Sequence, residues 1–443
     1  MKLNEIPSHI VNLAKKMGAT DVAAKLTEAQ RIMIRFSNNE ITISKIFLEN
    51  EVDVFLMIEK HRAATSISTL SLRNIEKAVK NLVRVAKSTP PADTYAPLPQ
   101  GPFTYNPNLI KAPKIPLNPD TLTSYVESAI NGALERGAER AAGTLNALRA
   151  KITLATSGDV YASQEIAGLE ISIRAFMSEI ATGHAVSVAS RIEDFKPEEA
   201  GMRAGEIAKA AANPKSGEPG KYMALLGPLV FADFVNQVGI LSSAFLVDAG
   251  QSFLVEKIGS EVASKKFTLV DDPTLPGTLG ARAFDDEGVP TRRNLIVENG
   301  LLKTYLHNST TAKKFGVETT GNAGLIVPYP WNLIVEPGNK SFDELLAEVD
   351  NGIYVTNDWY LRYQNYRTGD FSTIPRDGMF QIRRGEIEAS IRELRISDNM
   401  LRILQNIMDL SSSRTWVKWW EVEVPTLTPY ALISELNFTK SKM

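Results

Sequence analysis

Nine prolines lie within thirty residues of one another, and this stretch limits the possible fold more than any other feature of the chain. They are Pro90, Pro91, Pro97, Pro99, Pro102, Pro107, Pro113, Pro116 and Pro119. Because proline lacks a backbone N–H and has a fixed φ, the stretch is extended and cannot form a regular helix. We interpret residues 90–117 as a linker between domains. A Pro-rich ligand for an adaptor domain is the alternative.

The length of the chain and a second break indicate several domains. A chain of 443 residues is expected to form two or three domains of ~100–200 residues each. The second break comprises Asn213-Pro214, Gly217, Pro219 and Gly220. We predict an α+β fold that has an N-terminal α/β domain at 1–89, the Pro-rich linker at 90–117, a middle α+β domain at 118–217 and a β-rich C-terminal domain at 218–443.

Local patterns predict several of the elements. Apolar residues recur at helical spacing over 72–86 and again over 122–134. Alternating apolar residues on both sides of Asn38-Asn39 predict a hairpin. A second hairpin is predicted where strands at 294–298 and 301–307 flank Asn299-Gly300, because both positions of such a turn require φ > 0.

Composition excludes some classes of site and partner. Lys plus Arg total 49 and Asp plus Glu total 51, so the net charge of −2 argues against a dedicated nucleic-acid binder. The chain has no Cys, which excludes disulfides, thiolate zinc sites and cysteine nucleophiles. No stretch approaches the ~18–20 apolar residues of a membrane span. We expect a soluble, cytoplasmic protein that binds neither nucleic acid nor membrane.

Histidine is rare in this chain. The four histidines are His9, His61, His184 and His307, and no two lie within five residues of each other. A helix-borne metal site needs two imidazoles about one turn apart, so this arrangement cannot form. For His184, which lies in a strand-like run, the alternatives are a structural histidine and a lone metal ligand.

Two acidic clusters are the other candidates for chemistry. They are Asp271-Asp272 and Asp285-Asp286-Glu287. Paired carboxylates can bind Mg²⁺ or Ca²⁺ or share a proton, but Asp also favours turns by accepting hydrogen bonds from nearby backbone N–H groups. Both clusters precede Pro or Gly residues, and both interpretations stay open.

Two further features are weaker. A Ser–Lys nucleophile pair has no local signature, and the G-x-S-x-G motif is absent. Trp416, Trp419 and Trp420 indicate core or interface packing rather than a platform for stacking bases, because no excess of basic residues accompanies them.

A series of motifs resembles the TldD/PmbA family, also called modulator of DNA gyrase. The resemblance extends from about residue 30 to 410. Its motifs are Arg35-Phe36-Ser37-Asn38-Asn39-Glu40, Val270-Asp271-Asp272-Pro273-Thr274-Leu275-Pro276-Gly277, Phe284-Asp285-Asp286-Glu287-Gly288-Val289-Pro290-Thr291-Arg292-Arg293, Val297-Glu298-Asn299-Gly300, Thr319-Thr320-Gly321-Asn322-Ala323-Gly324 and Thr368-Gly369-Asp370-Phe371-Ser372.

The resemblance implies a cytoplasmic peptidase built from two paralogous subunits. The TldD type carries a metal site with an HExxxH motif on a helix and a downstream Cys, whereas the TldE (PmbA) type lacks this site. By position, the motif would fall within 229–241, which here contains no His and no Glu. The chain therefore resembles the TldE type. We expect no catalytic residue, no metal ligand and no cofactor in this chain, with zinc in the partner subunit.

The resemblance also implies partners and a substrate. The expected function is that of a non-catalytic subunit of a heteromeric metallopeptidase that acts on peptides or unfolded polypeptides. Its partner would be a TldD-type metal-bearing subunit or a second copy of this chain. The motif residues that could line a cavity or hold turns are Asp271, Asp272, Asp285, Asp286, Arg292, Arg293, Asn322 and Asp370. Two alternatives are an autonomous peptidase that uses carboxylates or a Ser–Lys pair, and a regulator of DNA gyrase.

Overall fold

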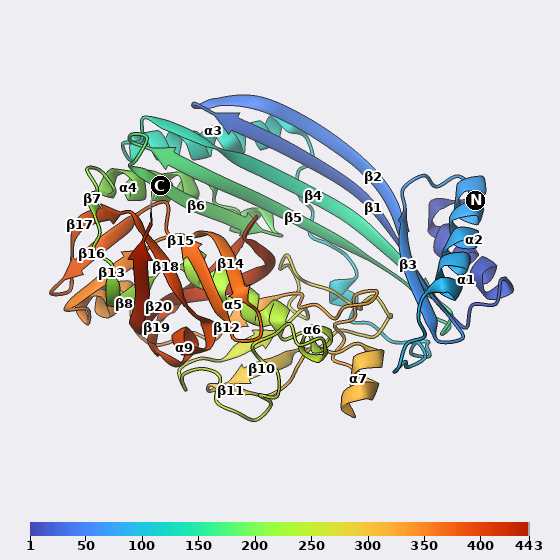
Figure 1. Cartoon of the computed structure of the whole chain (residues 1–443). Helices are drawn as coiled ribbons and strands as arrows, with labels where there is room; N and C mark the ends of the chain where they lie inside the picture. Colours follow the sequence, from blue (N-terminus) through green and yellow to red (C-terminus); the bar gives the residue numbers. More distant parts are fainter. Residues whose placement is uncertain (442–443) are drawn as a thin grey trace.

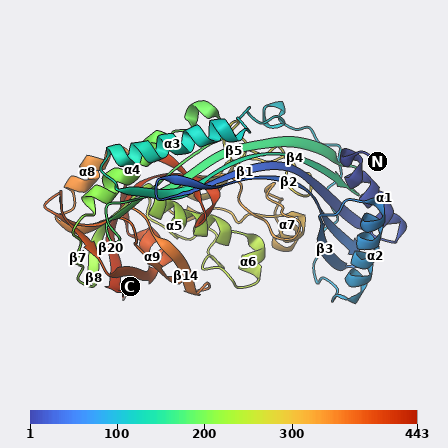
Figure 2. The same cartoon turned by 90° about the horizontal axis from the view of Figure 1, so that it is seen from above.

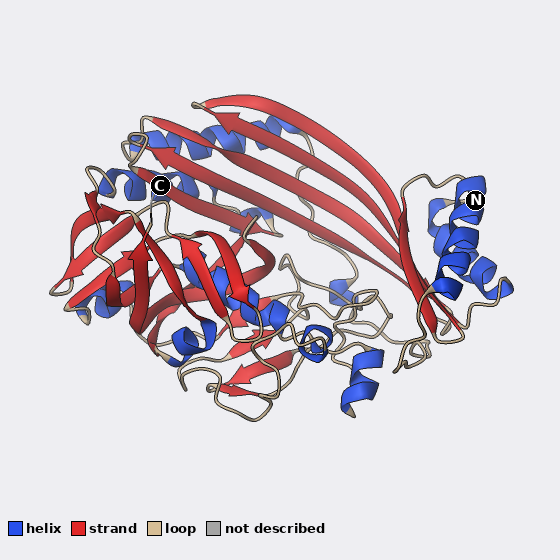
Figure 3. Ribbon diagram, viewed as in Figure 1, coloured by secondary structure: helices blue, strands red, loops and turns tan. Residues whose placement is uncertain are grey.

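The structure is a computed structural model that describes residues 1–441, and it has the predicted α+β fold. Figure 1 shows a long, arched sheet that extends from the N-terminal helices and passes over a compact C-terminal domain. Figure 3 shows that helices cover the outer side of this sheet at both of its ends. None of the helices in residues 1–441 is long and apolar enough to cross a membrane.

The arched sheet has six antiparallel strands in the order β3-β2-β1-β4-β5-β6. Its strands are β1 (Asp21–Ser37), β2 (Glu40–Ile58), β3 (His61–Ile67), β4 (Arg140–Thr156), β5 (Tyr161–Phe176) and β6 (Thr182–Ala189). β1 pairs with β4 from Ala23↔Thr156 to Phe36↔Gly143, so segments on the two sides of the Pro-rich stretch share one sheet. The hairpin predicted at Asn38-Asn39 joins β1 to β2, and both turn residues have positive φ.

The Pro-rich stretch runs along this sheet and contains one 3-10 turn, Pro107–Leu109. Backbone hydrogen bonds connect it to the sheet, for example from Gly101 N to Gly158 O at 2.7 Å and from Glu165 N to Ile110 O at 2.8 Å. The stretch therefore packs against β5 and the turn that precedes it.

Two pairs of helices cover the arched sheet (Figure 2). α1 (Ile6–Lys16) and α2 (Leu72–Ser88) share a core with one end of the sheet, and α3 (Pro119–Glu135) and α4 (Pro197–Ala210) share a core with the other. The apolar stripes predicted over 72–86 and 122–134 supply most of the buried residues of α2 and α3. α3 and α4 approach closely at Gly201, where an added Cβ would lie 1.9 Å from the Ala129 carbonyl oxygen.

The C-terminal domain contains a 14-stranded sheet of mixed direction. Its strands are β7 (Lys215–Ser216), β8 (Gly220–Leu226), β9 (Leu269–Asp271), β10 (Asn294–Glu298), β11 (Leu301–Leu302), β12 (Leu333–Val335), β13 (Asn351–Val355), β14 (Trp359–Asn365), β15 (Asp370–Ile374), β16 (Met379–Arg383), β17 (Glu386–Arg392), β18 (Leu394–Asn399), β19 (Ile407–Trp419) and β20 (Val422–Lys440). Its helices are α5 (Pro228–Leu241), α6 (Ala244–Asp248), α7 (Ser309–Phe315), α8 (Phe342–Ala347) and α9 (Met400–Gln405).

α5 is the central helix of this domain and is almost wholly buried. Its apolar side chains belong to the largest core of the molecule, together with residues of β8, β13 and β20. The hairpin predicted at Asn299-Gly300 joins β10 to β11. Its second strand ends at Leu302 rather than at 307, because Leu306 bonds instead to Ser242 near the end of α5.

Candidate functional site

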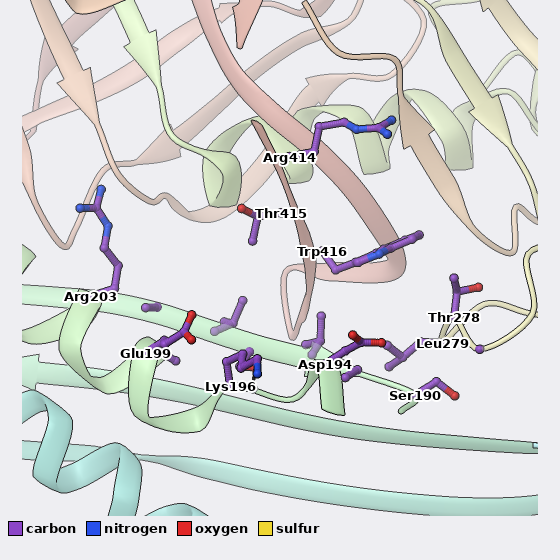
Figure 4. Close-up of a pocket in the computed structure, with 17 residues that line it drawn as sticks. Ser190, Asp194, Lys196, Glu199, Arg203, Thr278, Leu279, Arg414, Thr415 and Trp416 are labelled. Atoms are coloured by element: carbon purple, nitrogen blue, oxygen red, sulfur yellow. Dashed lines mark hydrogen bonds between the residues drawn. The ribbon is translucent and has the colours of Figure 1, made fainter. Parts of the chain in front are cut away.

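A groove of about 500 Å³ separates the arched sheet from the C-terminal domain (Figure 4). One wall is β6 and the residue after it, over 185–190. The opposite wall is the segment Arg414-Thr415-Trp416 of β19. α4 and the 3-10 turn Ile192–Asp194 contribute charged side chains, and the loop at 277–279 lines the groove at the end away from Arg203.

The edge of β6 gives the groove its distinctive chemistry. β6 is the last strand of its sheet and pairs with β5 on one side, from Phe176↔Thr182 to Leu169↔Ala189. On its other side, no strand within residues 1–441 pairs with it. An edge strand presents free backbone N–H and C=O groups to any extended chain that approaches. The groove therefore offers a template for main-chain hydrogen bonding.

Charged residues of both signs line the groove. Asp194, Lys196 and Glu199 are exposed on the α4 side. Arg414 lies on the β19 side, where its Nη1 donates to the Val335 carbonyl oxygen at 3.0 Å. The mixture of charges favours neither a polyanion nor a polycation along the length of the groove.

His184 connects β6 to the C-terminal domain beneath the groove. It is 2% exposed, and its ring lies 4.6 Å from that of Trp419 and 5.9 Å from that of Trp359, measured between ring centroids. Burial lowers the pKa of His184 to about 4, so the imidazole is neutral at pH 7. Of the two alternatives for His184, the packing supports a structural histidine.

Asn357 determines which nitrogen of His184 carries the proton. The Asp377 backbone N–H donates to Asn357 Oδ1 at 2.9 Å, and Asn357 Nδ2 donates to Asp377 Oδ2 at 2.8 Å. Asn357 Nδ2 also lies 3.2 Å from His184 Nδ1, which must therefore accept a hydrogen bond. The imidazole proton is then on Nε2, which donates to Ser172 Oγ at 2.8 Å. A general base would need the opposite tautomer, so this contact does not activate Ser172 as a nucleophile.

Asp377 anchors this interface between the sheet and the C-terminal domain. It is 1% exposed and accepts hydrogen bonds from Arg174 and Thr182 of the sheet and from Trp359 of β14. Burial alone would raise the pKa of Asp377, but the charge of Arg174 and the hydrogen bonds from Thr182 and Asn357 hold it below its usual value. The carboxylate is therefore charged and paired, which fits a structural anchor.

α5 occupies the position where the family resemblance places a metal motif. Its N-terminus, at Gly227, Pro228 and Leu229, lines a cavity of about 100 Å³ beside the groove. The helix itself contains no His and no Glu. Across residues 1–441, no three His, Asp or Glu side chains are grouped in a way that could hold a metal ion.

A buried acidic cluster that the sequence analysis missed lies around α5. Asp233 of α5 and Asp358 are both 0% exposed, and Glu421 is 9% exposed. One oxygen of Asp233 and one of Asp358 accept no hydrogen bond from any N–H or hydroxyl of residues 1–441, but the two carboxyls lie within hydrogen-bonding reach of each other. Burial raises the pKa of both carboxyls well above the usual range; Glu421 raises that of Asp233 further, and Asp233 that of Asp358. These three acids are far apart in the sequence, so no local pattern signals the cluster.

The structure brings some of the predicted motif residues together in loops of the C-terminal domain. Asp271 Oδ1 accepts hydrogen bonds from the backbone N–H groups of Trp331 and Asn332, and its Oδ2 accepts one from Asn322 Nδ2 at 2.6 Å. Asp285 accepts hydrogen bonds from the backbone N–H groups of Glu287, Val289 and Ala323. Burial raises the pKa of Asp271 to about 6. The bonds from Glu287 and Val289 to Asp285 are local and form a turn, whereas the partners of Asp271 lie in distant segments of the chain.

The other predicted residues are dispersed. Asp272 accepts hydrogen bonds from Thr274, and Asp370 accepts them from Thr368 and Asn399. Asp286 pairs with Lys25 of β1. Arg292 and Arg293 lie on the surface near Glu318 and Glu336. None of the eight predicted residues lines the groove.

Arg203 of α4 is one of the groove-lining residues that the sequence did not single out. Its Nη2 donates to the hydroxyl of Tyr354 at 3.0 Å. Nothing in the sequence signals that Arg203 faces two tyrosines, Tyr354 of β13 and Tyr430 of β20. The free edge of β6 was likewise hidden, because strand order is not a local property.

The family model for the PmbA/TldA metallopeptidase C-terminal domain matches residues 219–440, which is half of the chain. The chain belongs to the PmbA/TldD family. A metalloprotease of Methanocaldococcus jannaschii is 35% identical over 220 residues, covering 46% of this chain and 46% of the relative. The chain thus spans about half the length of the first curated relatives of the PmbA/TldD family that it matches.

Other PmbA/TldD relatives match over most of their length. A metalloprotease PmbA homologue of Haemophilus influenzae is 26% identical over 92% of this chain and 90% of its own. A Thermotoga maritima protein described as a candidate modulator of a DNA gyrase has a TM-score of 0.84 and 25% identity, over 99% of this chain and 100% of its own. TldE from Thermococcus kodakarensis has the same fold, with a TM-score of 0.84 and 21% identity, over 98% of this chain and 100% of its own.

Proposed function

We propose that this chain is the non-catalytic, peptide-binding subunit of a cytoplasmic metallopeptidase. The catalytic metal, zinc, would belong to a TldD-type partner. The observation that carries the proposal is the free edge of β6, which lines a groove of about 500 Å³ beside a buried helix, α5, that has no His and no Glu. Membership of the PmbA/TldD family supports the same conclusion.

The groove supports an extended or unfolded peptide as the substrate. An extended peptide can add as a new strand along β6, where main-chain hydrogen bonds supply affinity that is largely independent of sequence. One face of β6 is buried against α4 and the other against the C-terminal domain. It is therefore mainly the edge of β6 that can bind a peptide. A folded protein can offer such main-chain hydrogen bonds only where it exposes a strand edge of its own, so an extended segment is the favoured occupant.

Exposed aromatic side chains support an assembly through the C-terminal domain. Trp420 is 51% exposed and Tyr360 is 44% exposed, with ring centroids 5.4 Å apart. Trp419 behind them is 2% exposed and belongs to a core cluster. Trp and Tyr are enriched at protein interfaces. The partner would be the metal-bearing subunit, and a homodimer is the alternative.

Activity measurements on the chain with and without its partner test the proposal. The chain would be mixed with a TldD-type subunit, and cleavage of labelled, unfolded casein would be followed. Activity should appear only in the mixture, and it should vanish with a chelator or with replacement of the Glu in the partner's metal motif. Elemental analysis of the isolated chain should find no stoichiometric zinc.

Two results would contradict this function. One is cleavage of casein by the isolated chain, which would favour an autonomous peptidase. The other is about one tightly bound transition metal per isolated chain.

Replacement of His184 alone should not abolish the activity of the mixture. A change in DNA supercoiling by gyrase without any gain of peptidase activity would favour the gyrase-regulator alternative.

The role of the β6 edge has its own test. A labelled peptide should bind the isolated chain, and its affinity should fall when alternate backbone nitrogens of the peptide are methylated. Methylation removes main-chain donors without altering side chains, so an unchanged affinity would show that the peptide does not bind as an added strand.

A further inference from the structure

Arg203 lies where the groove meets the smaller cavity at the N-terminus of α5. Ala185, Val186, Arg203 and Thr415 line both cavities, so the two spaces adjoin at this point. The smaller cavity has a volume of about 100 Å³. Its walls are largely apolar and include Ile207, Leu229 and Val417. A cavity of this size holds several water molecules or one side chain of moderate size.

Two tyrosines position the guanidinium group of Arg203. Its Nη2 lies 3.0 Å from the hydroxyl of Tyr354 and 3.5 Å from that of Tyr430. Phe342 packs against both rings, at 5.4 Å from Tyr354 and 4.9 Å from Tyr430. Burial raises the pKa of Tyr354, so its hydroxyl remains protonated. The neutral hydroxyl of Tyr354 thus orients Arg203 without neutralising its charge.

Arg203 has hydrogen-bonding capacity that the described chain leaves unused. Within residues 1–441, the one carboxylate within 4 Å of it is Glu206, at 3.9 Å from Nη1, which is too far for a hydrogen bond. The Arg203 side chain is 44% exposed, so a ligand can reach it. Arg414, on the other wall of the groove, is instead occupied by the Val335 carbonyl oxygen.

The surroundings favour a carboxylate as the ligand. The guanidinium fork of arginine matches the two oxygens of a carboxylate. The first residues of α5, which has fourteen residues, also line the smaller cavity, and the positive end of a helix adds a favourable potential for an anion there. Apolar walls beside a carboxylate-binding group suit the last residue of a peptide, which carries both a side chain and a carboxylate.

We propose that the smaller cavity holds the C-terminal residue of a peptide that lies along β6, with Arg203 bound to its terminal carboxylate. This inference rests on the proposed function, because it takes the groove as the peptide site. The side chain of the last residue would pack against Ile207, Leu229 and Val417.

The position of Arg203 in the groove gives the bound peptide a direction. Arg203 lies at one end of the groove and the loop at 277–279 at the other, while the charges between them, Asp194, Lys196 and Glu199, are of both signs. The peptide would therefore extend from Arg203 towards the loop at 277–279. The substrates would be peptides with a free C-terminus, not internal segments of an intact chain.

A pair of peptides tests the inference. Two peptides of one sequence that end in Leu and carry an N-terminal fluorophore would differ only in a free or an amidated C-terminus. Fluorescence anisotropy with the full chain should show that the acid binds roughly tenfold to a hundredfold tighter than the amide, as expected for a hydrogen-bonded charge pair.

Variants of the chain assign the effect to Arg203. Arg203→Gln should bring the acid-to-amide affinity ratio close to one. Tyr430→Phe, which removes only a hydroxyl, should lower the ratio severalfold. Arg136→Gln is the matched control, because Arg136 lies 3.5 Å from Glu206 but lines neither cavity, and it should leave the ratio unchanged. Thermal unfolding would confirm that each variant is folded.

The outcomes separate this inference from the function on which it rests. Equal binding of acid and amide by the unmodified chain overturns the inference and leaves the groove as a peptide site. Binding of neither peptide overturns both. An unchanged ratio in Arg203→Gln and Tyr430→Phe overturns the assignment. Binding of N-acetyl-leucine as tight as that of the peptide overturns the peptide as ligand and points to a small carboxylate.

Discussion

Lys25 of β1 and Asp286 of the C-terminal domain form an ion pair between residues 261 positions apart in the chain. Lys25 Nζ lies 2.7 Å from Asp286 Oδ2, and the side chains are 16% and 8% exposed. Asp53 lies 3.5 Å from Lys25, and Arg282 lies 3.7 Å from Asp286. The pair joins the arched sheet to a loop of the C-terminal domain, far from the contact at His184.

Lys25→Met should destabilise the chain by up to about 3 kcal/mol, because it leaves Asp286 largely buried with only the more distant Arg282 as a partner. The free energy of unfolding from guanidinium titration measures the effect. Lys45→Met, at an exposed position of β2, is the control and should change it little. Equal effects of the two changes would mean that the pair does not stabilise the contact between sheet and domain.

Mild acid should destabilise the folded chain through its buried histidines. Burial lowers the pKa of His184 and of His307 from 6.5 to about 4. Between pH 4 and pH 6.5 the unfolded chain therefore binds protons that the folded chain does not. As a result, the free energy of unfolding falls as pH drops from 6.5 towards 4. For His184 the loss should reach about 3 kcal/mol.

His184→Gln should flatten this part of the pH profile, measured as the free energy of unfolding at pH 7, 6, 5 and 4. Gln can still donate a hydrogen bond to Ser172, although it leaves space between Trp359 and Trp419. A profile as steep as that of the unmodified chain would show that His184 is not the residue that titrates.

Asp358→Asn should stabilise the chain at alkaline pH. Burial raises the pKa of Asp358, and the charge of the neighbouring Asp233 raises it further, so the folded state prefers the protonated form. The protonated carboxyl of Asp358 stabilises the folded state fully below about 3.9, which is the pKa of an Asp in the unfolded chain. This stabilisation is lost as pH rises through the pKa that Asp358 has in the folded state. Asn is neutral at every pH and can donate a hydrogen bond to the unpartnered oxygen of Asp233.

Guanidinium titrations at pH 5 and pH 8 check this prediction, with a larger gain for Asp358→Asn expected at pH 8. Thr373 Oγ1, which donates to Asp358 Oδ2 at 3.0 Å, can keep its bond to the Asn oxygen. A loss of stability at both pH values would mean that the carboxyl group of Asp358 is needed for another contact.

Gly300→Val should destabilise the β10–β11 hairpin by at least about 1–2 kcal/mol. Asn299 and Gly300 have φ of 45° and 81°, and a Cβ on Gly300 would lie 2.3 Å from the Ala263 carbonyl oxygen. Gly259→Val is the matched control, because Gly259 has φ of 77° but no atom within 4 Å of an added Cβ. Chemical denaturation should show the larger loss for Gly300→Val, and equal losses would mean that only the dihedral angle matters.

Features that depend on a few neighbouring residues could be predicted from the sequence. The stripe over 72–86 became the buried face of α2, because side-chain spacing by itself decides which positions share a helix face. Both predicted hairpin turns, at Asn38-Asn39 and Asn299-Gly300, have positive φ at both positions. The strand after Gly300 is shorter than predicted, because Leu306 bonds to a distant segment that local alternation does not report.

The candidate site could be predicted only in part. Asp285 accepts hydrogen bonds from Glu287 and Val289 in a local turn, next to the Gly and Pro that the sequence shows there, whereas Asp271 accepts them from the distant Trp331 and Asn332. Arg203, by contrast, looks like any exposed residue of an amphipathic helix. Its proximity to Tyr354, 151 residues away, depends on how α4 packs against the C-terminal domain.

The amino-acid sequence by itself determined which chemistry this chain lacks and where its local elements form. The chain has no Cys, and the α5 segment carries no His or Glu, in any fold. Only the tertiary structure decided that β1 pairs with β4 across the Pro-rich stretch, that β6 is left as a free edge, and that Arg203 meets two hydroxyls beside α5. These relationships arise from contacts between segments far apart in the chain, and the free energy of those contacts depends on packing rather than on any local pattern.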